Sequence, residues 1–166
     1  MVQPIAMGAQ RLLQITDTHL FADPGRIHAG ANNEARLQAV LNAMRPWAAQ
    51  ASALIHTGDL VHDELETAYW RLRDALGSLN LPGLVIPGNH DLRALINQVF
   101  ATGPLQAARQ IVLDDWCVIA LDTLGDDFEV KLTLPGDEVL AGVLVDLDLD
   151  GRVLFGDLLE RLDELR

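Results

Sequence analysis

Residues 84–91 read LVIPGNHD, a short apolar run that ends in a turn and then in polar side chains. The run is typical of a buried strand, and Pro87 and Gly88 mark the turn at its end. Two earlier stretches have the same form, because residues 12–19 read LLQITDTH and residues 53–59 read ALIHTGD. Each stretch predicts a strand whose carboxyl end carries polar, chemically useful side chains.

Helical spacing follows each of these strands. Residues 33–47 have an asparagine-rich start that can cap a helix, and Pro46 is expected to kink or end its last turn. Further helices are expected over residues 65–79 and 92–99. Three strand–helix units in a row predict an α/β fold in which helices cover a β-sheet. The side chains expected in its core are Leu37, Val40, Leu41, Met44, Trp47, Leu65, Ala68, Leu72, Leu76 and Leu79, together with Trp70 and Trp116.

The second half of the chain has a different texture. Residues 112–121 predict a further strand, around a turn at residues 114–115. After residue 123 apolar and polar residues alternate, which favours antiparallel hairpins over crossovers, and a short amphipathic helix is expected over residues 156–166. No repeat or long linker divides the sequence, so a single domain over residues 1–166 is expected.

Composition narrows the function. Twelve Lys and Arg against 24 Asp and Glu give a net charge of −12, which argues against a nucleic-acid polymer as partner. Residues 1–10 do not have the form of a signal peptide, and no stretch approaches the roughly 20 apolar residues that cross a bilayer. We therefore expect a cytoplasmic protein without a membrane partner. Cys117 is the single cysteine and lies in an apolar run, where we expect a buried, unreactive thiol.

The polar residues after the three strands are expected to lie close together. The carboxyl ends of strands in an open α/β sheet are where ligands bind, so Asp17, His19, Asp59, Asn89 and His90 should converge there. These side chains suit Mn, Fe or Zn, and one carboxylate can bridge two ions about 3.5–4 Å apart. Such a pair of ions favours phosphoester hydrolysis, in which a nearby histidine protonates the leaving oxygen.

Three motifs of the calcineurin-like metallophosphoesterases resemble stretches of this sequence, in the same order: residues 17–19 (DTH), 58–59 (GD) and 88–91 (GNHD). The surrounding sequence is similar to that of bacterial 3',5'-cyclic-AMP phosphodiesterases over about residues 11–123. The resemblance implies a β-sheet layered with helices, as part of a four-layer α/β/β/α sandwich. Residues 124–166 would then be a divergent part with hairpins and a terminal helix.

The resemblance also implies a role for each matching residue. The implied metal ligands are Asp17 and His19 for a first ion, Asp59 as the bridge, and Asn89 for a second ion and for phosphate. His90 would contact the substrate and protonate the leaving group, and Asp63, or less commonly His62, would orient it. The implied cofactors are two divalent metal ions, Fe or Mn with Zn as a further option. The implied partner is a small phosphodiester such as a cyclic nucleotide, and a homodimer stays open.

The histidine count departs from the family pattern. All five histidines, at positions 19, 28, 56, 62 and 90, precede the Gly-His and Gly-His-x-His motifs that the family carries later. The first ion would therefore lack one ligand and the second ion two, so weak or absent activity is expected. Two functions stay open: a hydrolase of cyclic nucleotides, and a non-catalytic, truncated or degenerate domain that binds metal or a partner.

Several polar residues have plainer interpretations. His56 is expected to be a satisfied histidine within its strand, and His28 and His62 to be surface loop residues. Asp91 is either a helix cap or a partner of the ligands, and it is not counted among the ligands. Residues 146–157 resemble the start of a calcium-binding loop, but the preceding alternation favours a β-hairpin with an acidic face. A calcium-binding protein is thus a third alternative.

Overall fold

The computed structural model describes residues 11–113, 116–121 and 140–145. A parallel sheet lies at its centre, with the strand order β1-β4-β5-β6. Its strands are β1 (Leu12–Ile15), β4 (Ala53–Thr57), β5 (Gly83–Ile86) and β6 (Leu105–Gln106). Ile15 pairs with His56, and Thr57 pairs with Ile86, so the carboxyl ends of the first three strands lie side by side.

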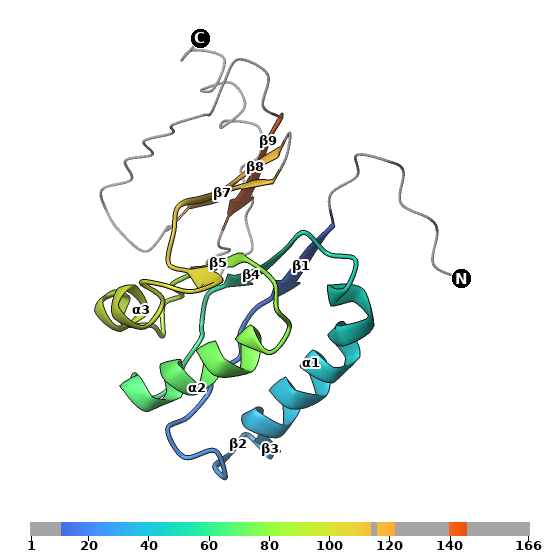
Figure 1. The fold of residues 1–166 in the computed structure, drawn as a ribbon. Helices are drawn as coiled ribbons and strands as arrows, with labels where there is room; N and C mark the ends of the chain where they lie inside the picture. Colours follow the sequence, from blue (N-terminus) through green and yellow to red (C-terminus); the bar gives the residue numbers. More distant parts are fainter. Residues whose placement is uncertain (1–10, 114–115, 122–139, 146–166) are drawn as a thin grey trace.

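Three helices cover one face of this sheet, as Figure 1 shows. They are α1 (Asn33–Ala48), α2 (Glu66–Gly77) and α3 (Arg93–Val99), close to the predicted bounds. The Asn32 side chain accepts a hydrogen bond of 2.7 Å from the Ala35 amide, which confirms the predicted asparagine cap of α1. Pro46 lies inside α1 near its end, and the helix stops at Ala48, within a turn of the predicted position.

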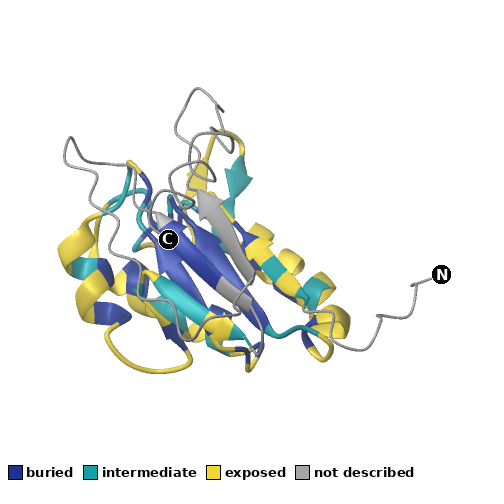
Figure 2. Cartoon of the chain, turned by 90° about the horizontal axis from the view of Figure 1, so that it is seen from above, coloured by how far each residue is buried: buried dark blue, intermediate teal, exposed yellow. Residues whose placement is uncertain are grey.

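The main core lies between the helices and the sheet. Leu37 and Leu41 of α1 and Leu72 and Leu76 of α2 are buried there, as the helical spacing predicts. Figure 2 shows the buried strands at the centre and the helices with their outer faces exposed. The buried residues of each helix form an apolar stripe along one face, and this face packs against the sheet.

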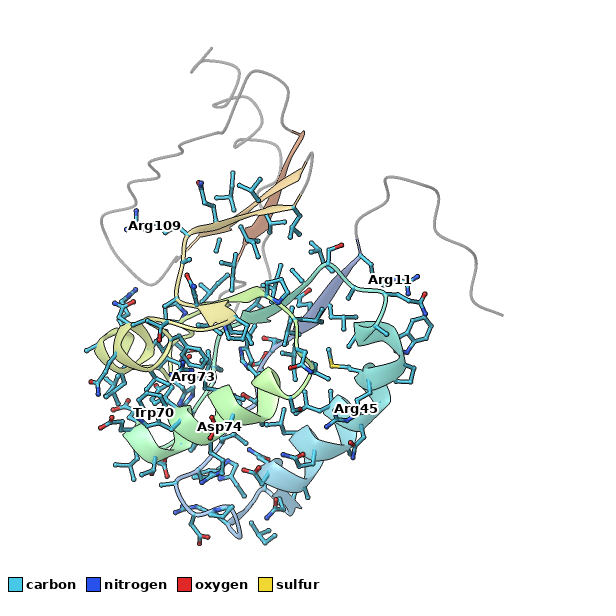
Figure 3. The ribbon with its side chains drawn as sticks, viewed as in Figure 1. Arg11, Arg45, Trp70, Arg73, Asp74 and Arg109 are labelled. Carbon is cyan, nitrogen blue, oxygen red and sulfur yellow. The ribbon has the colours of Figure 1, made fainter. Side chains whose placement is uncertain are left out.

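For four residues the prediction of a core position is wrong. Val40, Leu65, Trp47 and Trp70 are exposed, the two tryptophans to 41% and 39%. The guanidinium of Arg11 lies 5.4 Å from the Trp47 ring, and that of Arg73 lies 5.1 Å from the Trp70 ring. Figure 3 shows Trp70 and Arg73 on the same helix. Each indole thus makes a cation–π contact with an arginine at the surface. The spacing of apolar residues in the sequence does not distinguish such a position from a core position.

A second sheet covers the opposite face. It consists of β7 (Gln110–Leu113), β8 (Trp116–Leu121) and β9 (Leu140–Val145), in that order. Ile55, Leu84 and Ile86 of the first sheet form a second core cluster with Val118 and Ala120 of β8. The described residues thus form a helix layer and two sheets, which agrees with the predicted α/β fold.

The pairing in the second sheet corrects the predicted topology. The single strand predicted over residues 112–121 is divided into β7 and β8, which are antiparallel, whereas β8 and β9 are parallel. Parallel strands cannot be joined by a tight turn, so β8 and β9 do not form a hairpin with each other. The partner strands of the hairpins predicted after residue 123 lie outside the described residues. The expected acidic hairpin, calcium-binding loop and terminal helix lie outside the described residues, as does the side chain of Cys117.

Two short features escaped prediction. β2 (Ile27–His28) and β3 (Ala31–Asn32) form a small antiparallel pair just before α1. β6 extends the central sheet by two residues. Pairs this short carry too few residues to show a periodic pattern. Within the described residues, no helix has the length and apolarity to cross a membrane.

Candidate metal centre

The loops after β1 and β4 run side by side. The amides of Asp17 and His19 donate to the carbonyl oxygens of Gly58 and Asp59, over 3.1 and 2.9 Å. The loop after β5 joins them, because the His90 amide donates to Asp59 Oδ1 over 3.0 Å. The three motifs therefore converge at the carboxyl ends of the parallel strands, as their positions in the sequence predict.

The backbone of this centre is strained at its acidic and histidine residues. Asp17, His19 and Asp59 have φ angles of 54°, 41° and 52°, in the left-handed region that side chains other than glycine rarely adopt. Each such residue costs on the order of 1–2 kcal/mol, and strain of this kind concentrates at functional sites. The hydrogen bonds between the loops hold these conformations in place.

Gly88 is required by a close approach. A Cβ atom there would lie 2.2 Å from the Asp59 amide nitrogen and 2.3 Å from Asp59 Oδ1. Any larger residue would collide with the backbone and the carboxylate of Asp59. Gly88 in the third motif therefore leaves the room that Asp59 of the second motif needs to lie this close.

Asp17, His19 and Asp59 form a donor set that fits a divalent metal ion. His19 Nε2 lies 3.4 Å from Asp59 Oδ2 and 3.8 Å from Asp17 Oδ1. One ligand atom from each residue lies within 4.8 Å of the others. Ligands bound at about 2.0–2.2 Å to one ion are about 3–3.5 Å apart, so small side-chain movements suffice to close the set. Two carboxylates and an imidazole suit Mn, Fe or Zn.

The remaining predicted site residues are arranged around this set. Asn89 is exposed in the turn between Gly88 and His90. The ring of His90 lies edge-on to that of His19, with 5.0 Å between the centroids. The described contacts bring His90 beside the donor set, and the roles of Asn89 and His90 remain predictions.

Asp63 lies in a different contact from the predicted one. Its Oδ2 accepts a hydrogen bond of 2.8 Å from the Ala22 amide, and its buried Oδ1 has no partner within the described residues. The ring beside His90 is that of His62, stacked at 5.0 Å with an angle of 19°. His62, the alternative that the sequence left open, is therefore the neighbour of His90. The orienting role of Asp63 remains a prediction.

His62 lies in a loop, as predicted, but its side chain is only partly exposed. The Nδ1 atom of His62 lies 3.4 Å from His19 Nδ1. Burial, followed by the nearby charge of His28, lowers the pKa of His62. His28 itself is exposed as predicted, although its ring lies 4.6 Å from that of His62. The position of His62 in the loop after β4 was the signal that pointed to this place.

His56 is a buried histidine, as predicted, but only one of its nitrogens has a partner. Its side chain is 0% exposed, and its Nε2 lies 2.9 Å from Thr18 Oγ1. The Thr18 hydroxyl donates to the Leu60 carbonyl over 2.9 Å, so it accepts from His56 Nε2–H. Nδ1 is buried without a partner in the described part of the chain. Burial, and secondly the charge of His19, lowers the pKa of His56 to about 3.

Asp91 ties two of the loops together. Its carboxylate accepts hydrogen bonds from the amides of Leu60 at 3.0 Å, Val61 at 3.2 Å and Gly88 at 2.8 Å. The Tyr69 hydroxyl donates to it over 3.1 Å. Asp91 thus serves the loops and not the start of α3, which has no side-chain cap. Burial raises the pKa of Asp91, and these hydrogen bonds oppose the rise.

Comparison with known proteins defines the class. The sequence profile of the calcineurin-like phosphoesterases matches residues 10–158. The chain therefore belongs to the calcineurin-like phosphoesterase family, in agreement with its α/β fold and with the resemblance of its three motifs.

Within this family, the chain is similar to proteins named as cyclic-nucleotide phosphodiesterases. The chain is 36% identical over 122 residues to the 3',5'-cyclic adenosine monophosphate phosphodiesterase CpdA of Escherichia coli (strain K12), a match that covers 72% of this chain and 44% of that protein. It is 33% identical over 114 residues to CpdA of Haemophilus influenzae, covering 68% and 42% of the two chains. A probable cyclic nucleotide phosphodiesterase of Synechococcus sp. is 32% identical over 125 residues, covering 74% and 48%. The matches span less than half the length of these relatives.

Proposed function

We propose that this chain is a metal-dependent phosphodiester hydrolase that acts on a cyclic nucleotide such as cyclic AMP. The observation that carries the proposal is the convergence of Asp17, His19 and Asp59, with ligand atoms within 4.8 Å of one another at the carboxyl ends of the parallel strands β1 and β4. The names of the relatives support a cyclic-nucleotide substrate.

Two divalent metal ions, Fe or Mn with Zn as a further option, are the cofactors of this proposal. Asp17 and His19 would hold the first ion, Asp59 would bridge, and Asn89 would hold the second ion. When bound, the ions would neutralise charge on the phosphate and activate a water molecule. The His90 amide occupies Asp59 Oδ1, so that Oδ2 is the oxygen that faces His19 Nε2.

His90 is the proposed acid for the leaving oxygen. Its ring stands beside His19 and against His62, both with centroids 5.0 Å away. Histidine is the residue type that most often serves as a general acid in enzymes. We keep Asp63 as the proposed orienting residue and add His62, whose ring contacts that of His90.

The setting of this activity follows from the same proposal. A cytoplasmic protein is consistent with the composition, and the net charge of −12 favours a small substrate over a nucleic-acid polymer. We propose a single domain over residues 1–166, and a homodimer is a further proposal that a sedimentation measurement would test.

A second candidate is a non-catalytic module of the same fold that binds metal or a partner. It requires the Asp17, His19 and Asp59 donor set to bind metal, but it requires no turnover. The two candidates differ in one measurable property. Both bind metal, but only the hydrolase turns over a phosphodiester.

The test uses the 166-residue chain loaded with Mn²⁺ or Fe²⁺. Bound metal is measured first, and then the hydrolysis of cyclic AMP and of bis(p-nitrophenyl) phosphate. We expect Asp59→Ala to lose metal and turnover, and His90→Ala to keep metal while turnover falls about 100-fold or more. Asp74→Ala is the matched control, because Asp74 is an exposed acidic residue of α2 (Figure 3). Turnover that survives both site substitutions would refute the hydrolase, and metal binding without turnover would favour the module.

A further inference from the structure

Three histidines from three different loops lie side by side in the described structure. His19 follows β1, His62 follows β4 and His90 follows β5, and we call them the histidine cluster. One ligand atom from each lies within 4.8 Å of the other two. All three side chains are half-buried, so the cluster is neither a flexible surface group nor part of the core.

The spacing of two of these rings is that of metal ligands. The Nδ1 atoms of His19 and His62 are 3.4 Å apart, longer than an ordinary hydrogen bond of about 2.7–3.2 Å. Two nitrogens bound to one tetrahedral ion at about 2.0–2.1 Å are about 3.3 Å apart. One ring nitrogen of His90 lies within 4.8 Å of a nitrogen of each of the other two rings, so a modest side-chain movement would complete the set.

The two nitrogens of His19 face different donor sets. Nε2 faces the carboxylates of Asp59 and Asp17, at 3.4 and 3.8 Å, whereas Nδ1 faces His62. A neutral imidazole has a single lone pair for a metal ion, because its other nitrogen carries the proton. His19 therefore binds an ion on one side at a time, and the two sides compete for it.

Neighbouring rings hold His62 in the cluster. Phe21 lies 4.8 Å from its ring and His28 lies 4.6 Å from it. These ring contacts limit the rotation of the His62 side chain. A restrained ligand loses less conformational freedom on binding, which favours affinity.

We propose that the histidine cluster is a second metal site, built of three imidazoles and selective for Zn²⁺, Co²⁺ or Ni²⁺ over Mn²⁺. Imidazole ligands suit these ions, whereas carboxylates suit Mn²⁺. Three protein ligands leave a fourth position for water, as in many zinc sites. Occupation of this site takes His19 away from Asp17 and Asp59, so Zn²⁺ opposes metal binding by the carboxylate set. The proposal does not depend on any hydrolytic activity.

The test measures Zn²⁺ affinity of the metal-free 166-residue chain by competition with a chromophoric chelator. We expect His62→Gln to weaken Zn²⁺ binding at least about tenfold. His28→Gln is the matched control, because it removes an adjacent exposed imidazole that is not one of the three ligands, and we expect a much smaller loss than in His62→Gln. Asp17→Asn distinguishes the two donor sets, because it removes a ligand of the carboxylate set and none of the histidine cluster.

Two readouts guard against misfolding and against adventitious binding. His62→Asn is a second variant, and circular dichroism reports whether either variant keeps the fold. In the wild-type chain, Zn²⁺ should shift the NMR signals of the His62 ring. Unchanged affinity in a folded His62 variant, or an equal loss in His28→Gln, would overturn the proposal. Loss in Asp17→Asn alone would place Zn²⁺ in the carboxylate set and overturn it as well.

Discussion

Acidification should unfold this protein partly through His56. The group is fully buried, and its pKa is lowered from 6.5 to about 3. A histidine that titrates near 6.5 in the unfolded chain and near 3 in the fold binds its proton first in the unfolded chain. Its contribution to stability is therefore intact above pH 6.5 and is lost progressively as the pH falls toward 3.

The size of the effect follows from the same two pKa values. At pH 5 His56 is protonated in the unfolded chain but not in the folded chain. This pH lies about 1.5 units below the pKa of His56 in the unfolded chain, 6.5. At about 1.4 kcal/mol per unit, the free energy of unfolding falls by about 2 kcal/mol between pH 7.5 and pH 5. That is a large fraction of a typical total of about 5–15 kcal/mol.

Urea unfolding at pH 7.5 and pH 5.0, in the presence of a chelator, measures this loss. His56→Gln keeps an N–H for Thr18 but does not titrate, so its loss over the same range should be smaller by about 2 kcal/mol. His28→Gln is the control, because His28 is exposed, and we expect the wild-type loss. An identical loss in the wild type and in His56→Gln would show that His56 takes up its proton in the fold, and would refute the reasoning.

Three further substitutions test the packing of the centre. Tyr69→Phe should lower the free energy of unfolding by about 1–3 kcal/mol, because the hydroxyl joins Asp91 and the Leu92 amide; thermal unfolding measures it, and no change would contradict that role. Gly88→Ala should weaken Mn²⁺ binding in a metal titration, since its methyl group would collide with Asp59; wild-type affinity would show that the loop adjusts freely. Leu41→Ala should cost about 2–5 kcal/mol in urea unfolding, and Trp47→Ala clearly less, because Leu41 is buried and Trp47 is exposed; equal costs would contradict this assignment of the α1 faces.

The strands β4 and β5 of the parallel sheet were predictable because the sequence gives two signals for each of them. An apolar run such as residues 84–86 gives the strand, and the glycine or proline after it gives the end. The convergence of three motifs then follows from the topology of parallel strands alone. The pairing of β8 with β9 was beyond prediction, because alternation indicates a strand but does not determine the direction of its partner.

Side-chain contacts between loops were the harder part. His62 looks like any polar loop residue in the sequence, and its contact with His19 depends on how two loops are aligned. Trp47 has core-like spacing, but the arginine that covers it comes from a distant position, Arg11. The hydroxyl of Tyr69 bonds to the loop before α3, while the rest of the residue fits a helix core. Such contacts are set by tertiary packing and leave no periodic signal in the sequence.

The carboxylate of Asp91 has a consequence for motion. Three amides on two loops, those of Leu60, Val61 and Gly88, share this one acceptor. Breaking the contact frees all three at once, so their hydrogens should exchange with solvent at similar rates and with similar protection. We therefore expect the loop after β4 and the loop after β5 to open as one cooperative unit. A ligand that stabilises one loop should then slow the opening of the other.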